Sequence, residues 1–171
     1  MSKTKVIAFA NNKGGSGKTT TCSNVGCAMA MLGKKVLMID GDMQLNLTIS
    51  YFDEEQALEF AKGGKNIHSA LKEEKDLTDY IVETGIDGLD IIPSTSLMSG
   101  IEFDLFSKWQ REFILKKCME RVKATGYYDY ILIDSPPHAW LLGNEYYVLG
   151  GLRGNSRRGK SLGLVRACEY V

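Results

Sequence analysis

The chain has 171 residues, of which 44% are hydrophobic and 25% are charged, as in an ordinary globular domain. Lys plus Arg and Asp plus Glu each number 21, so no overall charge indicates a nucleic-acid or an acidic partner. No apolar run approaches the ~20 residues that cross a bilayer. The N-terminus also lacks the pattern of a secretory signal. We therefore expect a cytoplasmic protein that does not bind membranes and whose four cysteines are reduced thiols, mostly buried.

The first 40 residues predict one strand–helix–strand unit. Residues 5–10 form an apolar run typical of a buried strand, and a glycine-rich loop follows at residues 11–17. Residues 18–32 predict a helix that Gly33 ends, and residues 35–39 predict a second strand. Because such a crossover joins parallel strands, we expect an α/β fold with a mostly parallel sheet and helices on both faces.

Further helices and strands are expected in the middle of the chain. The predicted short helices cover residues 53–61, 67–71 and 76–83, and the predicted strands cover residues 89–92 and 130–133. Residues 103–124 predict one long amphipathic helix whose apolar stripe consists of Phe106, Trp109, Phe113, Ile114, Cys118 and Val122. His68 and His138 have no partners at catalytic spacing, so we interpret both as surface or loop histidines.

The strongest motif is a phosphate-binding loop. Residues 13–20 read Lys-Gly-Gly-Ser-Gly-Lys-Thr-Thr and lie between a predicted strand and a predicted helix, as such a loop requires. Glycines let backbone N–H groups approach phosphate oxygens, and the start of the helix adds its positive dipole end. Lys18 is placed to neutralise the terminal phosphates, and the Thr19 hydroxyl to coordinate Mg²⁺. The residues expected to bind the nucleotide are Gly14, Gly15, Ser16, Gly17, Lys18, Thr19 and Thr20.

Carboxylates follow two of the predicted strands. Asp40 and Asp42 come directly after the second strand, and Asp134 ends the apolar run 130–133 and is followed by Ser-Pro-Pro. A carboxylate at the carboxyl end of a strand lies at the edge of an open α/β sheet where ligands bind. Transfer of a phosphoryl group to water needs a group that orients the water and charges that hold a metal ion. These three carboxylates are therefore the candidates for that chemistry.

Residues 11–20, which read Asn-Asn-Lys-Gly-Gly-Ser-Gly-Lys-Thr-Thr, resemble the deviant Walker A motif of the ParA/MinD ATPases. Residues 40–48 resemble the following family motif, and their Gln44, Asn46 and Thr48 favour the ParA/Soj branch, although Met43 stands where the family usually has proline.

The resemblance implies a role for each candidate residue of a P-loop ATPase. Lys13, Lys18 and Asp42 would be catalytic: Lys13 reaches the nucleotide of a partner chain, and Asp42 positions or activates the attacking water. Thr19, Asp40 and Asp134 would serve the metal, with Asp134 holding Mg²⁺ through water and Asp40 supporting both the metal and the loop around it.

The implied function is an ATP-binding and ATP-hydrolysing switch for plasmid or chromosome partitioning. The implied cofactors are ATP or ADP and Mg²⁺, and the implied partners are a second copy in an ATP-dependent homodimer, a ParB-like activator and non-specific DNA at the nucleoid. A MinD-like or nitrogenase-reductase-like protein is a weaker alternative, because no terminal amphipathic helix or cluster-binding cysteines are present. A nucleotide-binding remnant or interaction module without catalysis stays an alternative from another class.

The resemblance is visible over residues 5–137, so we expect residues 1–137 to be the P-loop core. Residues 138–171 are rich in glycine and arginine and show no helix period or strand alternation. We interpret this segment as an atypical tail of a truncated or altered chain, and its Arg153, Arg157, Arg158 and Lys160 as solvated. The expected sheet is then incomplete on its C-terminal side, and we expect the chain alone to dimerise and hydrolyse ATP poorly.

Overall fold

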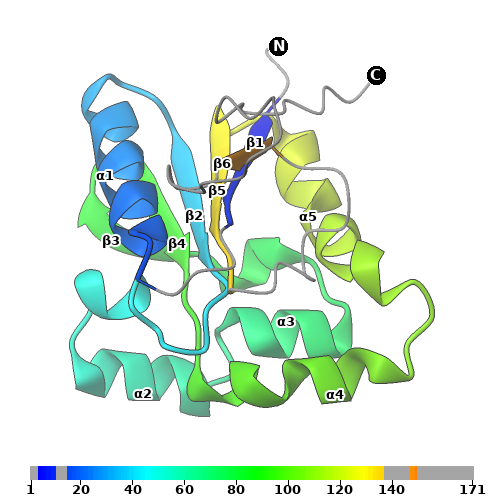
Figure 1. Ribbon diagram of the computed structural model, residues 1–171. Coiled ribbons are helices and arrows are strands. Elements are labelled where there is room, and N and C mark those ends of the chain that lie inside the picture. The colour runs from blue at the N-terminus through cyan, green and yellow to red at the C-terminus, as the bar shows by residue number, and fades with distance from the viewer. Residues whose placement is uncertain (1–3, 11–14, 137–146, 150–171) are drawn as a thin grey trace, which may run out of the picture.

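The computed structural model describes residues 4–10, 15–136 and 147–149, and its centre is a six-stranded sheet (Figure 1). The strand order is β3-β4-β2-β5-β1-β6. All neighbouring strands pair in parallel except β3, which runs antiparallel to β4 at one edge. The strands are β1 (Lys5–Phe9), β2 (Val36–Asp40), β3 (Val82–Ile86), β4 (Leu89–Ile92), β5 (Tyr130–Asp134) and β6 (Tyr147–Leu149).

Helices cover both faces of the sheet. α1 (Lys18–Met31) packs on one face, against side chains such as Met38, Leu89 and Leu132. α3 (Ile67–Glu73), α4 (Ile101–Phe106) and α5 (Ile114–Thr125) enclose the larger core on the other face. In Figure 1, α2 (Glu54–Lys62), α3 and α4 lie along the edge where the parallel strands end. The short 3₁₀ helices are η1 (Thr48–Ser50), η2 (Leu77–Tyr80), η3 (Ser96–Gly100) and η4 (Arg111–Phe113).

A glycine in the middle of α1 lets this helix approach the sheet closely. A Cβ built on Gly26 would lie 2.9 Å from the sulfur of Met38 on β2 and 3.3 Å from Leu89 on β4. A side chain at this position would push α1 away from the sheet. Since α1 carries the phosphate loop at its first turn, its distance from the sheet also fixes how far that loop lies from the carboxyl ends of the strands.

The α/β class with a mostly parallel sheet is confirmed. The predicted strands at residues 5–10, 35–39, 89–92 and 130–133 correspond to β1, β2, β4 and β5, and the helices at 18–32, 53–61 and 67–71 correspond to α1, α2 and α3. Cys22 and Cys118 are buried free thiols, as expected, and Cys27 is half-buried. Lys13, Gly14, His138 and most of the expected tail lie outside the described residues.

The single helix predicted over residues 103–124 is wrong. The chain forms α4, η4 and α5 there, because Gln110 adopts a left-handed backbone conformation with φ of 54° that no helix can continue through. Ile114, Cys118 and Val122 are buried as predicted, but the side chains of Phe106 and Trp109 are 74% and 86% exposed. Two of the three aromatic residues of the predicted apolar stripe are therefore on the surface, and the third, Phe113, is half-buried.

Three smaller predictions also need correction. Residues 76–83 form the short η2 and the start of β3, because Thr84 and the glycines at 85 and 88 favour a hairpin. A strand, β6, occurs at residues 147–149, where no strand pattern was recognised. His68 is buried, and its Nε2 lies 3.3 Å from the Asp104 carboxylate on α4. It therefore joins α3 to α4 within the fold.

Candidate functional site

The phosphate loop ends where α1 begins. Gly15 and Gly17 have φ angles of 69° and 78°, in the left-handed region that glycine adopts without strain. Gly17 caps α1 without any side-chain hydrogen bond. The first turn of a helix has N–H groups without partners inside the helix, and its dipole is positive at this end. This end of α1 is therefore suited to an anion.

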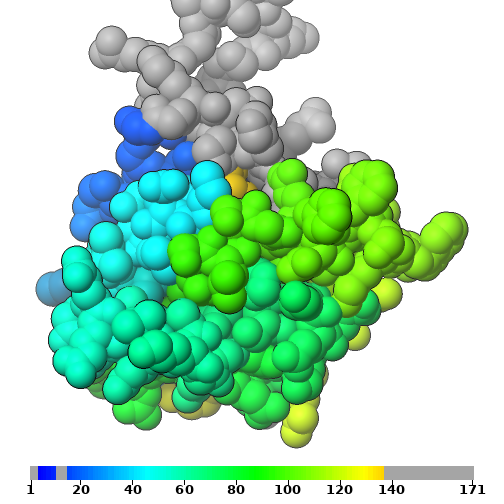
Figure 2. Space-filling view, turned by 90° about the horizontal axis from the view of Figure 1, so that it is seen from below, coloured from blue at the N-terminus to red at the C-terminus, as the bar shows by residue number. Residues whose placement is uncertain are grey.

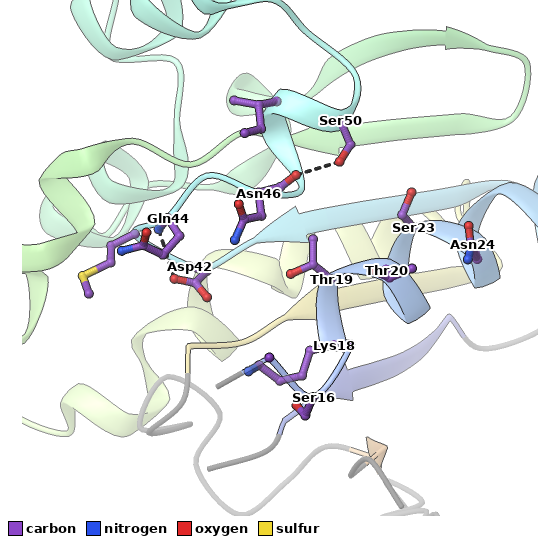
Figure 3. Close-up of a pocket in the computed structure, with 14 residues that line it drawn as sticks. Ser16, Lys18, Thr19, Thr20, Ser23, Asn24, Asp42, Gln44, Asn46 and Ser50 are labelled. Atoms are coloured by element: carbon purple, nitrogen blue, oxygen red, sulfur yellow. Dashed lines mark hydrogen bonds between the residues drawn. The ribbon is translucent and has the colours of Figure 1, made fainter. Parts of the chain in front are cut away.

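A cavity of about 830 Å³ lies between the start of α1 and the loop after β2. Figure 3 shows the side chains of Lys18, Thr19, Asp42 and Asn46 around this space, with the Thr19 hydroxyl and the Asp42 carboxylate facing each other across it. The cavity is lined by Gly15, Ser16, Gly17, Lys18, Thr19, Thr20, Ser23, Asn24, Asp42, Met43, Gln44, Asn46, Ile49 and Ser50. Six of the seven expected phosphate-loop residues and Asp42 thus surround one space, and Gly14 is outside the described residues.

Asp42 is held on a folded loop that we call the Asp42 loop, residues 41–50. Its carboxylate oxygen Oδ1 accepts the backbone N–H of Gln44 at 3.0 Å. Leu45 has a φ of 57°, which is uncommon for a residue other than glycine and indicates a strained turn. The loop therefore places one acidic side chain at the cavity wall opposite the positive end of α1.

Asp40 is adjacent in the chain but lies in a different environment. Its side chain is fully buried, it does not line the cavity, and its oxygens accept three hydrogen bonds. Burial raises the pKa of this carboxyl to about 7, although the hydroxyl and N–H of Thr48 act in the opposite direction. The structure thus places Asp40 behind the Asp42 loop, which it supports from within the protein.

Asp134 ends β5, directly opposite Asp40 in the register of the two paired strands. It is fully buried, and in the described part of the chain no donor meets hydrogen-bond geometry with either carboxylate oxygen, although the Thr19 hydroxyl lies near enough to favour the charged form. The pKa of the Asp134 carboxyl is raised to about 6, mainly by burial and further by the negative charge of Asp42. The Thr19 hydroxyl and the positive charge of Lys18 act in the opposite direction and lower this pKa. Asp134 therefore lies next to both Thr19 and Asp42, and its oxygens remain available to a hard cation or to water that such a cation binds.

No cluster of three or more His, Cys, Asp or Glu side chains among the described residues has the arrangement of a metal site formed by protein alone. Within the described ranges, none of the helices has the length and apolar character that a membrane-spanning segment needs.

Seven lining residues were not among the predicted site residues: Ser23, Asn24, Met43, Gln44, Asn46, Ile49 and Ser50. Of these, Met43, Gln44 and Asn46 had been named only as part of the family motif. Ser23 and Asn24 follow Thr19 and Thr20 by four residues, so the helical period places them on the same face of α1 and would have identified them. Ile49 and Ser50 reach the cavity because η1 turns the chain back toward α1, where the Tyr51 hydroxyl bonds Ser23 Oγ at 2.8 Å.

The sequence matches the protein family described as the AAA domain over residues 4–147. It is 41% identical over 138 residues to the sporulation initiation inhibitor protein Soj of Bacillus subtilis, and this match covers 81% of the chain and 52% of Soj. It is 38% identical over 133 residues to the chromosome partitioning protein ParA of Caulobacter vibrioides, covering 78% of the chain and 48% of ParA. The chain spans about half the length of these relatives, and the family match continues past Pro137, where the motif resemblance ended.

Solved structures of similar fold agree with these matches. A putative plasmid partition protein from Borrelia burgdorferi bound to AMPPNP is 30% identical with a TM-score of 0.70, and the match covers 87% of this chain and 62% of that one. Cobyrinic acid a,c-diamide synthase from Mycobacterium smegmatis, with bound ATP analog and magnesium, is 28% identical with a TM-score of 0.76, covering 90% and 62%.

Proposed function

The chain belongs to the AAA-domain family of P-loop ATPases that includes Soj and ParA, and on this premise we propose that it binds and hydrolyses ATP with Mg²⁺ as a partitioning switch. The observation that carries the proposal is the cavity in which the phosphate loop faces Asp42. The nucleotides and magnesium in the similar solved structures support ATP or ADP and Mg²⁺ as its cofactors.

The phosphate-loop residues would bind the nucleotide through its phosphates. The backbone N–H groups of residues 15–20 and the positive end of α1 attract the anion, and Lys18 adds a full charge beside it. Thr19 lines the cavity and Asp134 lies behind it, near the Thr19 hydroxyl, which suits their oxygens to hold Mg²⁺ directly or through water. When bound, the metal supplies positive charge that stabilises the phosphates during transfer.

Asp42 would act on the water that attacks the terminal phosphate. It is the one carboxylate among the described residues that lines the cavity, whereas Asp40 and Asp134 are buried behind it. A carboxylate at this place accepts a hydrogen bond from water and orients it toward the phosphate. Lys13 would add charge from a partner chain in an ATP-dependent homodimer. We further propose a ParB-like activator and non-specific DNA at the nucleoid in the cytoplasm as the switch's context.

Nucleotide binding is tested with Lys18→Ala, measured by titration of a fluorescent ATP analogue with Mg²⁺. Because the variant removes the charge beside the terminal phosphates, we expect affinity to fall roughly 10- to 100-fold, in line with about 1.5–3 kcal/mol for a charged hydrogen bond. Lys34→Ala, at an exposed lysine beyond the other end of α1, is the control and should bind normally. Equal affinity in the Lys18 variant and the control would contradict the assignment.

Hydrolysis is tested with Asp42→Asn in single-turnover ATP cleavage. The amide keeps the shape of the side chain but is a much weaker base, so binding should stay within a few-fold while cleavage falls about 10²-fold or more. A parent chain that binds ATP and cleaves none would favour the alternative function, a nucleotide-binding module without catalysis. Equal cleavage by parent and variant would remove Asp42 from the mechanism.

A further inference from the structure

A buried network of hydrogen bonds holds the Asp42 loop from behind. Its first member is Asp40, whose Oδ2 accepts both the backbone N–H of Thr48 at 2.8 Å and the hydroxyl of Thr48 at 2.6 Å. Its Oδ1 accepts the backbone N–H of Asp42 at 3.2 Å. One carboxylate therefore joins the beginning and the end of the loop, and the loop closes over it.

The second member comes from a distant part of the chain. Ser94 lies two residues after the end of β4, and it makes two contacts with the Asp42 loop. Its backbone N–H donates to the Thr48 hydroxyl at 2.9 Å, and its own hydroxyl donates to the backbone carbonyl of Asp42 at 2.8 Å. In Figure 2 the cyan surface of the Asp42 loop lies directly against the green surface of the segment after β4.

These contacts fix both backbone polar groups of Asp42. The N–H donates to Asp40, and the carbonyl accepts both the Ser94 hydroxyl at 2.8 Å and the backbone N–H of Leu45 at 3.2 Å. The carboxylate accepts the N–H of Gln44, which sets its direction. Thr48 and Ser94 are both fully buried and neither lines the cavity, so neither would touch a ligand there. Their contacts instead act on the position of the residue that does line it.

The strained turn at Leu45 makes this support necessary. A loop with a non-glycine residue in the left-handed region persists where surrounding contacts hold it. Without the bonds from Ser94 and Thr48, only the local bonds to Leu45 and Asp40 would hold the Asp42 backbone among the contacts described, and we expect its carboxylate to shift relative to the phosphate loop. Displacements of about 1 Å at a reacting group lower rates by up to about 10²-fold.

We propose that Ser94 and Thr48 are positioning residues for Asp42: Ser94 directly, and Thr48 through Asp40, hold the Asp42 loop against the end of β4, so that the Asp42 carboxylate faces the phosphate loop. This inference rests on the proposed role of Asp42 in hydrolysis. It adds two residues that act through Asp42 and not on the nucleotide itself.

The test compares four variants in nucleotide affinity, single-turnover cleavage and backbone amide exchange of residues 41–50. Ser94→Ala removes the bond to the Asp42 carbonyl, and Thr48→Val removes the hydroxyl with little change of shape. Thr48→Ser keeps the hydroxyl and is the conservative rescue. Thr95→Ala is the matched control, because this neighbouring buried hydroxyl accepts the N–H of Leu97 in η3.

We expect Ser94→Ala and Thr48→Val to bind nucleotide within about threefold of the parent, to cleave it roughly 10- to 100-fold more slowly, and to exchange the amides of the Asp42 loop faster. Thr48→Ser and Thr95→Ala should resemble the parent in all three measurements. The proposal would be overturned if Thr48→Ser cleaved ATP as slowly as Thr48→Val. It would also be overturned if Thr95→Ala cleaved ATP as slowly as Ser94→Ala.

Failure of the proposed function gives a different result. If the parent chain binds no nucleotide or cleaves none, that function fails, and amide exchange then decides the structural claim alone. Faster exchange confined to residues 41–50 in Ser94→Ala and Thr48→Val supports it, and unchanged exchange overturns it. Thermal melting of each variant shows whether slower cleavage reflects partial unfolding, in which case exchange would rise throughout the chain and the positioning role would be wrong.

Discussion

Asp134 should destabilise the protein when no cation or nucleotide is bound. Its carboxylate is fully buried at the end of β5, and within the described residues no donor, the nearby Thr19 hydroxyl included, reaches hydrogen-bond geometry with its oxygens. A buried polar group without a partner costs about 1–3 kcal/mol, and more when it is charged. Asp134→Asn keeps the shape and removes the charge. We therefore expect the free energy of unfolding of the nucleotide-free protein to increase by about 1–2 kcal/mol at neutral pH.

The measurement is urea unfolding followed by circular dichroism, with EDTA present. With a denaturant slope of about 2–3 kcal/mol/M, the expected gain moves the midpoint up by roughly 0.5 M. Asp129→Asn is the control at the other end of β5, because the Asp129 carboxylate accepts the backbone N–H of Lys35 at 3.0 Å. This variant should gain nothing. A less stable Asp134→Asn would refute the reasoning that the carboxylate is unsatisfied.

The same substitution should reverse its effect when Mg²⁺ and ATP are added. A ligand at 100 times its dissociation constant stabilises the folded state by about 2.7 kcal/mol. The parent should show a gain of this size, and Asp134→Asn much less, since it lacks the anionic oxygens that a cation needs. If Mg²⁺–ATP stabilised both proteins equally, Asp134 would have no part in binding the metal.

Three further substitutions test how the site is supported. Tyr128→Phe removes the hydroxyl that donates to Asp90 at 2.6 Å, and we expect urea unfolding to show a free energy of unfolding lower by about 1–2 kcal/mol. An unchanged midpoint would mean that water replaces the hydroxyl. Gly26→Ala places a methyl group against Met38, and calorimetry should show a melting temperature lower by several degrees, corresponding to about 1–2 kcal/mol of overpacking. A melting temperature above that of the parent would show that α1 can accept a methyl group against the sheet. Tyr51→Phe removes the hydroxyl that is hydrogen-bonded to Ser23 and Cys27, so the backbone amides of η1 should exchange faster. In the parent, burial raises the pKa of the Tyr51 phenol to about 12, so these hydrogen bonds should persist to pH 10.

The sequence was most informative where local pattern and chemistry coincide. The glycines at 15 and 17 adopt the left-handed conformations that a phosphate loop needs, and the apolar runs before them and at 36–40 form parallel strands. These features depend on neighbours within a few residues. The family and the location of the cavity therefore followed from short stretches of sequence.

The errors arose where a distant contact or a single backbone conformation decided the result. An amphipathic period extends through residues 103–124, but one left-handed residue, Gln110, divides the segment and leaves Trp109 in solvent. His68 has no partner near it in sequence, yet α4 brings Asp104 within 3.3 Å of its ring. Periodicity cannot reveal either of these, because both depend on how the helices pack together.

Asp40 and Asp134 show the same limit within the site itself. Each follows an apolar run, and the family resemblance implied a role with the metal for both. In the structure the two are paired in register and both are fully buried. The structure distinguishes them by their hydrogen-bond donors. Asp40 is satisfied by groups of residues 42 and 48, and Ser94 completes that network from beyond β4.

Because a carboxylate that already accepts several hydrogen bonds has less capacity to bind a cation, the two residues should differ in what they do. Asp40 organises the loop that carries Asp42, and its effect on catalysis would be indirect. Among the described residues no donor meets hydrogen-bond geometry with the Asp134 carboxylate, and a divalent cation would give its oxygens a partner. If the site binds Mg²⁺ and phosphate as proposed, the two aspartates at equivalent strand ends would have different roles: Asp40 would keep the Asp42 loop rigid, and Asp134 would supply charge to the metal, because the backbone N–H groups of the loop reach only the Asp40 carboxylate.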